Sequence, residues 1–208
     1  RGGIVPTSIR QAVTESQKYF QNQLAEYLFY SAYSKWVDAK GRRETWAETI
    51  DRYNDFMRGR LGNKLSEVEY KEIRDYMLNM KALGSMRLLW AAGPAAEVTN
   101  VCAYNCAFIA PMKWQDFGEI MYVLMCGTGI GFSAERQNVE LLPIIKRQLK
   151  KKASVHVIED SKEGWADAFV LGLTTWSNGE DITFDYGKIR PQGARLKTMG
   201  GRASGPEP

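Results

Sequence analysis

The stretch VCAYNCAFIAPMKWQDFGEIMYVLMCGTGIGFSA, residues 101–134, decides the fold class of this 208-residue chain. It opens with an apolar run of strand length over residues 101–110, which the proline that follows closes. Residues 116–125 then place apolar side chains at helical spacing, and a second strand is predicted at residues 130–134. The order strand, helix, strand is typical of an α/β layer.

The same alternation continues toward the C-terminus. Residues 154–158 predict a strand, and Asp160 with Ser161 is expected to cap a helix that runs through residues 162–173. Residues 181–184 predict another strand. Strands that alternate with helices of this length predict an α/β layer or barrel, which we assign to residues 98–208.

The residues before this region have a helical pattern. Apolar and aromatic side chains recur every three or four residues, for example from Tyr19 to Ala32. A second helix is expected to begin near Thr45, and Ser66 begins a third with a capping box. We therefore predict a helical N-terminal domain over residues 1–97.

Composition and charge exclude several classes of protein. With 44% apolar and 12% aromatic residues, the chain can form a real hydrophobic core, and its net charge of +4 suits an anionic ligand. Three cysteines without a CxxC pair argue against a disulfide framework or a structural zinc site, and favour a reducing, cytoplasmic compartment. No apolar run reaches the roughly 18 residues of a membrane span, so we expect no membrane partner.

Residues 186–208 carry five cations and several glycines, with no acidic residue between Asp185 and Glu207. Glycine lets the backbone take positive φ angles and approach a ligand closely, so this segment predicts an anion-binding loop. Because the chain stops within the loop and begins with Arg1, we expect it to be a piece of a larger protein. The cations are Lys188, Arg190, Arg195, Lys197 and Arg202, and the glycines are Gly187, Gly193, Gly200, Gly201 and Gly205.

The cysteines are the first candidates for chemistry. Cys106 lies in an apolar strand, where it is either a buried core thiol or a redox group. Cys102 is expected on the same face of that strand, about 13 Å away at 3.3 Å per residue, which is too far for a disulfide. Cys126 is expected to pack in the core.

Other motifs support little chemistry of their own. Gly127, Gly129 and the glycine at 131 follow a helix and precede a strand, which is the wrong order for a dinucleotide fingerprint, although they allow close approach of a substrate. His156 is the single histidine, which argues against a histidine-based metal site or a Ser-His-Asp triad. Helix capping explains Asp160 better than catalysis does.

Several blocks together resemble the adenosylcobalamin-dependent ribonucleotide reductases, of the monomeric ribonucleoside-triphosphate type. The blocks occur in family order from about residue 30 to residue 208. They are YSKW (33–36), GRRETW (41–46), SMR (85–87), YNCAF (104–108), CGTGIGFS (126–133), DSKEGWA (160–166) and the segment from RP (190–191) to GPEP (205–208).

The resemblance implies a ten-stranded α/β barrel, of which this chain would hold the N-terminal helices and roughly the first half. Members of the family use adenosylcobalamin to start thiyl-radical chemistry that reduces ribonucleoside triphosphates to deoxyribonucleotides. By its position in the block, Cys106 resembles the first cysteine of the reducing pair. The other catalytic cysteines have no counterpart here, so we expect the chain to be inactive without the missing C-terminal half of the barrel.

The resemblance also implies binding residues and partners. The C-terminal loop would read the nucleotide, with Asn105, Gly127 and Gly129 lining the same pocket; the cofactor would be held mostly by residues outside this chain, and no metal ligands are expected. Expected partners are a ribonucleoside triphosphate, a deoxynucleotide effector, and thioredoxin or a similar dithiol. The substrate-loop candidates are Gly200, Gly201, Arg202 and Ser204.

Two alternatives remain open at this point. The chain could belong to the large subunit of a ribonucleotide reductase of another radical class, since the barrel is shared. It could also be a basic nucleic-acid-binding module that uses residues 146–152 and the C-terminal loop as a phosphate-binding stripe. Few aromatic residues lie between those cations, which disfavours stacking on bases and leads us to expect no nucleic-acid partner.

Overall fold

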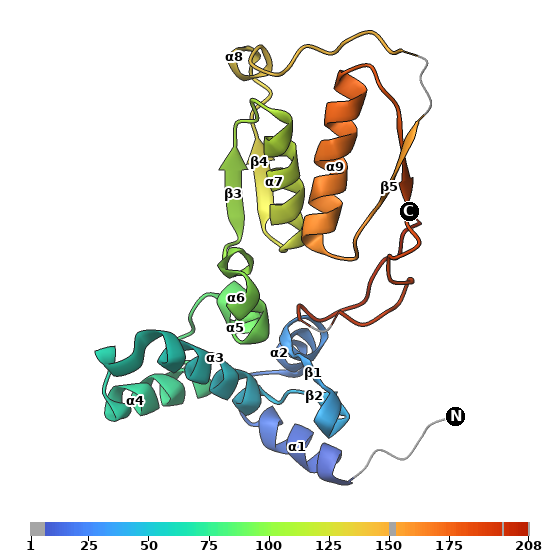
Figure 1. Ribbon diagram of the computed structural model, residues 1–208. Coiled ribbons are helices and arrows are strands. Elements are labelled where there is room, and N and C mark those ends of the chain that lie inside the picture. Colours follow the sequence, from blue (N-terminus) through green and yellow to red (C-terminus); the bar gives the residue numbers. More distant parts are fainter. Residues whose placement is uncertain (1–6, 150–152, 197, 208) are drawn as a thin grey trace. The chain divides into compact units, whose positions relative to one another are not determined.

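The structure, a computed structural model, describes residues 7–149, 153–196 and 198–207 (Figure 1). Arg1, residues 150–152 of the basic segment, Lys197 and Pro208 therefore lie outside the described residues. The chain divides into two compact units. Unit 1 comprises residues 1–103 with 198–200, and unit 2 comprises residues 104–197 with 201–208. The division into functional domains at residues 97 and 98 stays a prediction.

Unit 1 is mainly helical. The predicted second and third helices are confirmed, and each begins with a capping box, Thr45 with Glu48 and Ser66 with Glu69. The helices are α1 (Thr7–Gln17), α2 (Gln23–Leu28), α3 (Trp46–Leu61), α4 (Glu67–Leu78), α5 (Met86–Ala91) and α6 (Pro94–Val98), with a π-helical turn at Phe29–Tyr33, 3₁₀ turns at Asp38–Lys40, Gly62–Lys64 and Asn100–Ala103, and an antiparallel pair β1 (Trp36–Val37) and β2 (Arg42–Arg43).

The helical pattern from Tyr19 to Ala32 was expected to form one run, and this was wrong at its beginning. Tyr19 and Phe20 lie outside the helices, and α2 begins only at Gln23. The reason is local, because the Asn22 side chain accepts a hydrogen bond of 2.9 Å from the Ala25 amide and so caps a new helix.

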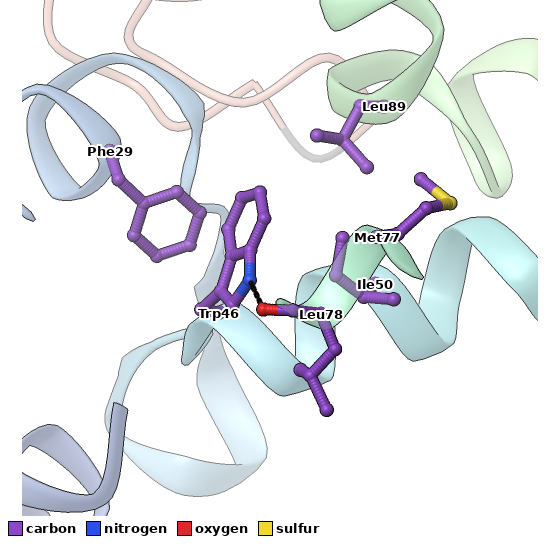
Figure 2. Close-up of a cluster of buried hydrophobic side chains, with 6 residues drawn as sticks. All are labelled: Phe29, Trp46, Ile50, Met77, Leu78 and Leu89. Carbon is purple, nitrogen blue, oxygen red and sulfur yellow. Dashed lines mark hydrogen bonds between the residues drawn. The ribbon is translucent and has the colours of Figure 1, made fainter. Parts of the chain in front are cut away.

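The core of unit 1 forms around Trp46, the first residue of α3. Its indole packs edge-on against Phe29, with ring centroids 5.3 Å apart, and its Nε1 donates a hydrogen bond of 2.9 Å to the Leu78 carbonyl (Figure 2). Ser16 Oγ accepts from the Trp46 amide at 3.0 Å. One residue therefore ties α1, α3 and the end of α4 together. The buried cluster is Phe29, Trp46, Ile50, Met77, Leu78 and Leu89.

A buried ion pair lies beside this core. The Glu44 carboxylate accepts from Arg52 Nε at 2.8 Å, from Arg52 Nη2 at 3.0 Å and from Thr49 Oγ1 at 3.0 Å. Arg52 Nη1 also donates to the carbonyls of Leu89 and Ala92, which fixes α5 to α3. Burial, and then the nearby Arg52, lower the pKa of Lys35 to about 8.

Unit 2 is a mixed α/β structure, as the sequence predicted. Two pairs of parallel strands, β3–β4 and β5–β6, are each joined by a crossover helix (Figure 1). In the part of the chain that the structure describes, β4 and β5 are not paired, so the half barrel stays a proposal. The elements are β3 (Cys106–Ile109), α7 (Trp114–Met125), β4 (Gly129–Phe132), α8 (Arg136–Val139), β5 (Ser154–Val157), α9 (Lys162–Ser177) and β6 (Ile182–Asp185).

The prediction of one strand over residues 101–110 was wrong in its first half. Residues 100–103 form a 3₁₀ turn, and the strand begins only at Cys106. Cys102 is fully buried in unit 1 against Ala91 and Ala95, and its thiol donates to the Thr99 carbonyl at 3.0 Å. Packing within unit 1 therefore overrides the strand pattern, and the two cysteines do not share a strand face.

Helices α7 and α9 lie side by side, and their contact depends on Gly118 (Figure 1). A Cβ at Gly118 would lie only 2.4 Å from Val170 Cγ2 and 3.5 Å from the Ala166 carbonyl oxygen. The glycine thus allows the two helices to pack closely. Among the described helices, none is both long and apolar enough to cross a membrane.

Replacing Gly118 with valine is expected to lower the free energy of unfolding of unit 2 by about 1–3 kcal/mol, because the added side chain overpacks this contact. Chemical denaturation followed by hydrogen exchange of α7 amides measures the change. Adding Val170→Ala should restore part of the loss. The control is Gly59→Ala in α3, where no atom lies within 4 Å of the new Cβ, and which should not destabilise the chain. Equal effects of the two single variants would contradict this account.

Candidate functional site

Cys106 begins strand β3 on a face that is open to solvent. It pairs in register with Gly129 of β4, and Phe108 pairs with Gly131. Because alternate residues of a strand point to one side, these four positions share a face, and all four are exposed. The alternative of a buried core thiol was therefore wrong for Cys106. The two glycines leave the surface beside the thiol without side chains, which gives a substrate room to approach.

The turn before β4 is held against the start of β3. Gly129 donates its amide to the Asn105 carbonyl at 2.9 Å, and the buried Thr128 hydroxyl donates to the Tyr104 carbonyl at 2.8 Å. Gly127 supports the turn with φ of +85°, which L-residues rarely adopt. The structure thus brings Asn105, Gly127 and Gly129 together around Cys106.

Three of the four substrate-loop candidates, Gly200, Gly201 and Arg202, lie in a hairpin over residues 193–203, of which the structure describes 193–196 and 198–203. The amide of Gly193 donates to Ala203 at 2.9 Å, that of Ala203 donates to Ala194 at 2.8 Å, and that of Leu196 donates to Gly201 at 3.0 Å. Arg202 Nη1 donates to the Gly193 carbonyl at 2.9 Å, and Ser204 is exposed just beyond the stem. Of the five loop glycines, those at residues 193, 200, 201 and 205 take positive φ.

Two of the loop cations have carboxylate partners that the local sequence does not indicate. Arg190 Nε donates to the Asp160 carboxylate at 2.8 and 3.0 Å, and Lys188 forms an ion pair with Glu159. Asp160 and Ser161 were together expected to cap α9, and this was wrong for Asp160 alone. Ser161 caps the helix instead, accepting from the Gly164 amide at 2.9 Å. The loop therefore carries fewer available cations than its composition suggests.

Most of the chain is similar to known proteins. Residues 7–94 match the ribonucleotide reductase alpha domain. Across most of its length the chain is also similar to adenosylcobalamin-dependent ribonucleoside-triphosphate reductases, with 28% identity to the one from Euglena gracilis over 90% of this chain and 26% to the one from Lactobacillus leichmannii over 94%. The chain is thus similar to ribonucleotide reductases along most of its length. A putative reductase of the same type from Mycobacterium phage D29 is 29% identical over 88% of this chain.

The similarity covers a limited part of these reductases. The chain spans 28% of the Euglena gracilis enzyme, 36% of the Lactobacillus leichmannii enzyme and 31% of the phage protein. It thus spans about a third of the length of these relatives. Whatever the whole reductases bind or catalyse applies to this chain only as a proposal.

The structure adds one residue to the candidate site around Cys106 and leaves two others outside it. Gly131 was not among the predicted site residues, although its spacing two positions after Gly129 places it on the same strand face. Cys126 is fully buried, with Lys162 Nζ at 3.6 Å from its sulfur, as expected for a packed thiol. His156 packs edge-on against Phe184, and no group of three or more metal-binding side chains occurs among the described residues.

Proposed function

We propose that this chain forms part of a ribonucleoside-triphosphate reductase and that Cys106 is one of its two reducing thiols. The observation that carries the proposal is the exposed Cys106 beside Gly129 and Gly131 on one open strand face, in a chain related to the reductases. An accessible thiol can react with a substrate, whereas the buried Cys102 and Cys126 cannot do so without rearrangement.

The proposed chemistry is a two-electron reduction at the 2′ carbon of the ribose. Two thiols together supply two electrons and two protons, the 2′ hydroxyl leaves as water, a new C–H bond forms, and the sulfurs become a disulfide. Since Cys102 and Cys126 are buried, the second thiol is proposed to come from outside these 208 residues. Thioredoxin or a similar dithiol would then reduce the disulfide by thiol–disulfide exchange.

The hairpin over residues 193–203 is proposed to contact the nucleotide. Its glycines at 200 and 201 take φ angles of +79° and +87°, which lets backbone amides face an anion, and its arginines suit a phosphate or a base edge. Gly200, Gly201, Arg202 and Ser204 remain the candidates for this contact. A deoxynucleotide effector that acts on the same loop is part of the proposal.

Adenosylcobalamin, the cofactor in the names of the relatives, is proposed for the whole enzyme, where it supplies the radical that starts the reaction. The residues described here do not offer it a recognisable site. The only histidine, His156, packs against Phe184, and the Cys106 face is an open surface formed with Phe108, Gly129 and Gly131. The role of Cys106 as a reducing thiol needs no contact with the cofactor.

We further propose that the two parallel strand pairs belong to a ten-stranded α/β barrel completed by other residues. The crossovers β3–α7–β4 and β5–α9–β6 are the repeating units from which such barrels are built. The exposed face with Cys106 would then line the interior of the barrel, where the substrate binds. The separate sheets seen here leave strand edges available for that pairing.

The test is reduction of a ribonucleoside triphosphate with adenosylcobalamin and a dithiol. The chain is assayed alone and after mixing with the C-terminal two thirds of the Lactobacillus leichmannii relative. We expect no deoxynucleotide from the chain alone, and cofactor-dependent product from the mixture. Product from the chain alone would overturn the proposed division of the site, and a mixture that assembles without forming product would overturn the assignment. Product that needs a metal-loaded second subunit instead of the cofactor would favour another radical class.

A further inference from the structure

The two segments that form the ion pairs leave the same edge of one sheet. Strands β5 and β6 are parallel neighbours with Val157 opposite Asp185, and the Ile158 amide donates to the Asp185 carbonyl at 3.0 Å. The residues that follow each strand therefore emerge side by side at the carboxyl ends of the strands. In open α/β sheets this is the edge at which ligands bind.

The turn after β5 is held rigidly. Ile158 is fully buried, Ser161 caps α9, and a Cβ at Gly164 would lie 2.3 Å from the Glu159 carbonyl oxygen. Only glycine fits at that position without moving the backbone of the turn. The backbone of Glu159 and Asp160 is thus fixed from both sides, and their carboxylates project toward the segment that follows β6.

The base of the hairpin is attached to this turn. The Arg190 guanidinium contacts both carboxylate oxygens of Asp160, and its Nη2 also donates to the Asp160 carbonyl at 3.3 Å. Lys188 pairs with Glu159 on the same turn. The two ends of the hairpin also approach closely, since a Cβ at Gly205 would lie 2.9 Å from the amide nitrogen of Gln192. The turn, the base and the stem thus form one connected unit.

We infer that Asp160 and Arg190 are positioning residues for the hairpin over residues 193–203. Their ion pair fixes the base of the hairpin on the turn before α9 and occupies Arg190 internally, as Glu159 occupies Lys188. An anionic ligand of the hairpin is therefore recognised by Arg202, whose Nη1 donates to the Gly193 carbonyl, rather than by Lys188 and Arg190, which pair with carboxylates. Recognition of a nucleoside triphosphate by the hairpin rests on the proposed function. The positioning of the hairpin by Asp160 and Arg190 does not.

Hydrogen exchange of the stem amides tests the positioning role directly. In the 208-residue chain, Asp160→Asn is expected to raise the exchange rates of the Gly193, Leu196 and Ala203 amides about fivefold, because a partly exposed ion pair is lost. Arg190→Gln should do the same without altering the turn, and the Ile158 amide reports whether β5 remains folded. The matched control is Asp167→Asn, which removes an exposed carboxylate from α9. Unchanged stem exchange in both Asp160→Asn and Arg190→Gln would overturn the inference.

Charge reversal separates positioning from a general structural effect. Arg190→Asp should loosen the stem, and the exchanged pair Asp160→Arg with Arg190→Asp should recover protection of the same three amides. If the stem amides of the double variant are no better protected than those of Arg190→Asp alone, the Asp160–Arg190 ion pair does not position the hairpin.

Binding of ATP and of inorganic tripolyphosphate tests ligand selection. Arg202→Gln is expected to weaken binding about tenfold, and Lys188→Gln less than twofold, since hydrogen bonds between charged groups are the strong ones. Equal losses for the two variants would overturn the assignment of the ligand to Arg202. If stem exchange responds to Asp160→Asn while neither ligand binds the unmodified chain, the proposed function fails and the positioning role stands. If ATP binds the unmodified chain and stem exchange does not respond to Asp160→Asn, the positioning role fails and the proposed function stands.

Discussion

Replacing Trp46 with alanine is expected to lower the free energy of unfolding of unit 1 by about 3–5 kcal/mol. The side chain is 3% exposed and packs against Phe29, and deleting it leaves a large cavity among α1, α3 and α4. It also removes the donor to the buried Leu78 carbonyl, which then has no partner in its place. Hydrogen exchange of α3 amides in increasing denaturant measures the loss for this unit separately from unit 2.

Two further variants divide this effect into parts. Trp46→Phe keeps most of the packing and removes the hydrogen bond to Leu78, so a loss of about 1–3 kcal/mol is expected. Leu24→Ala changes a side chain that is 65% exposed and should stay within about 0.5 kcal/mol of the unmodified chain. A Trp46→Ala chain as stable as the Leu24→Ala chain would show that this core does not hold unit 1 together.

The parts of the fold that sequence predicts well are those with local signals. The capping boxes at Thr45 and Ser66 involve residues three apart, so the starts of α3 and α4 could be predicted from a few side chains. The strand that begins at Cys106 is the second half of an apolar run over residues 101–110. The first half of that run has the same apolar pattern but forms no strand. Cys102 leaves the strand because it packs against alanines of α5 and α6, and that contact is not visible in the local sequence.

The residues of the candidate site also include some that local sequence predicts and some that it does not. Cys106, Gly127 and Gly129 lie in short motifs, and the β3–β4 register brings them together. The pairing of Arg190 with Asp160 was missed because the residues are 30 positions apart, and they meet only because β5 and β6 are adjacent. Counting charges within the loop could not reveal that two of its cations, Lys188 and Arg190, pair with carboxylates outside it.

Cys106→Ser is expected to lower ribonucleotide reduction by the complemented enzyme at least about a thousandfold. Serine has nearly the same shape as cysteine, but its hydroxyl cannot give up electrons to form a disulfide. Because Cys106 is exposed, the change should leave the stability of unit 2 within about 0.5 kcal/mol, so a loss of turnover would report chemistry rather than folding. Product is measured in a single turnover without added dithiol, so that only thiols of the protein supply electrons.

The control for this variant is Ala107→Ser, which places the same hydroxyl on the opposite face of β3 and should leave most of the turnover intact. Comparison of the two variants therefore tests which face of β3 the reaction uses. The change from a thiol to a hydroxyl at Cys106 tests whether that thiol supplies electrons. If Cys106→Ser forms product as fast as Ala107→Ser under these conditions, Cys106 is not a reducing thiol, and the open face of β3 and β4 serves substrate binding alone. If both variants lose turnover equally, the two faces of the strand are not distinguished by function, which would contradict the assignment of the open face to the barrel interior.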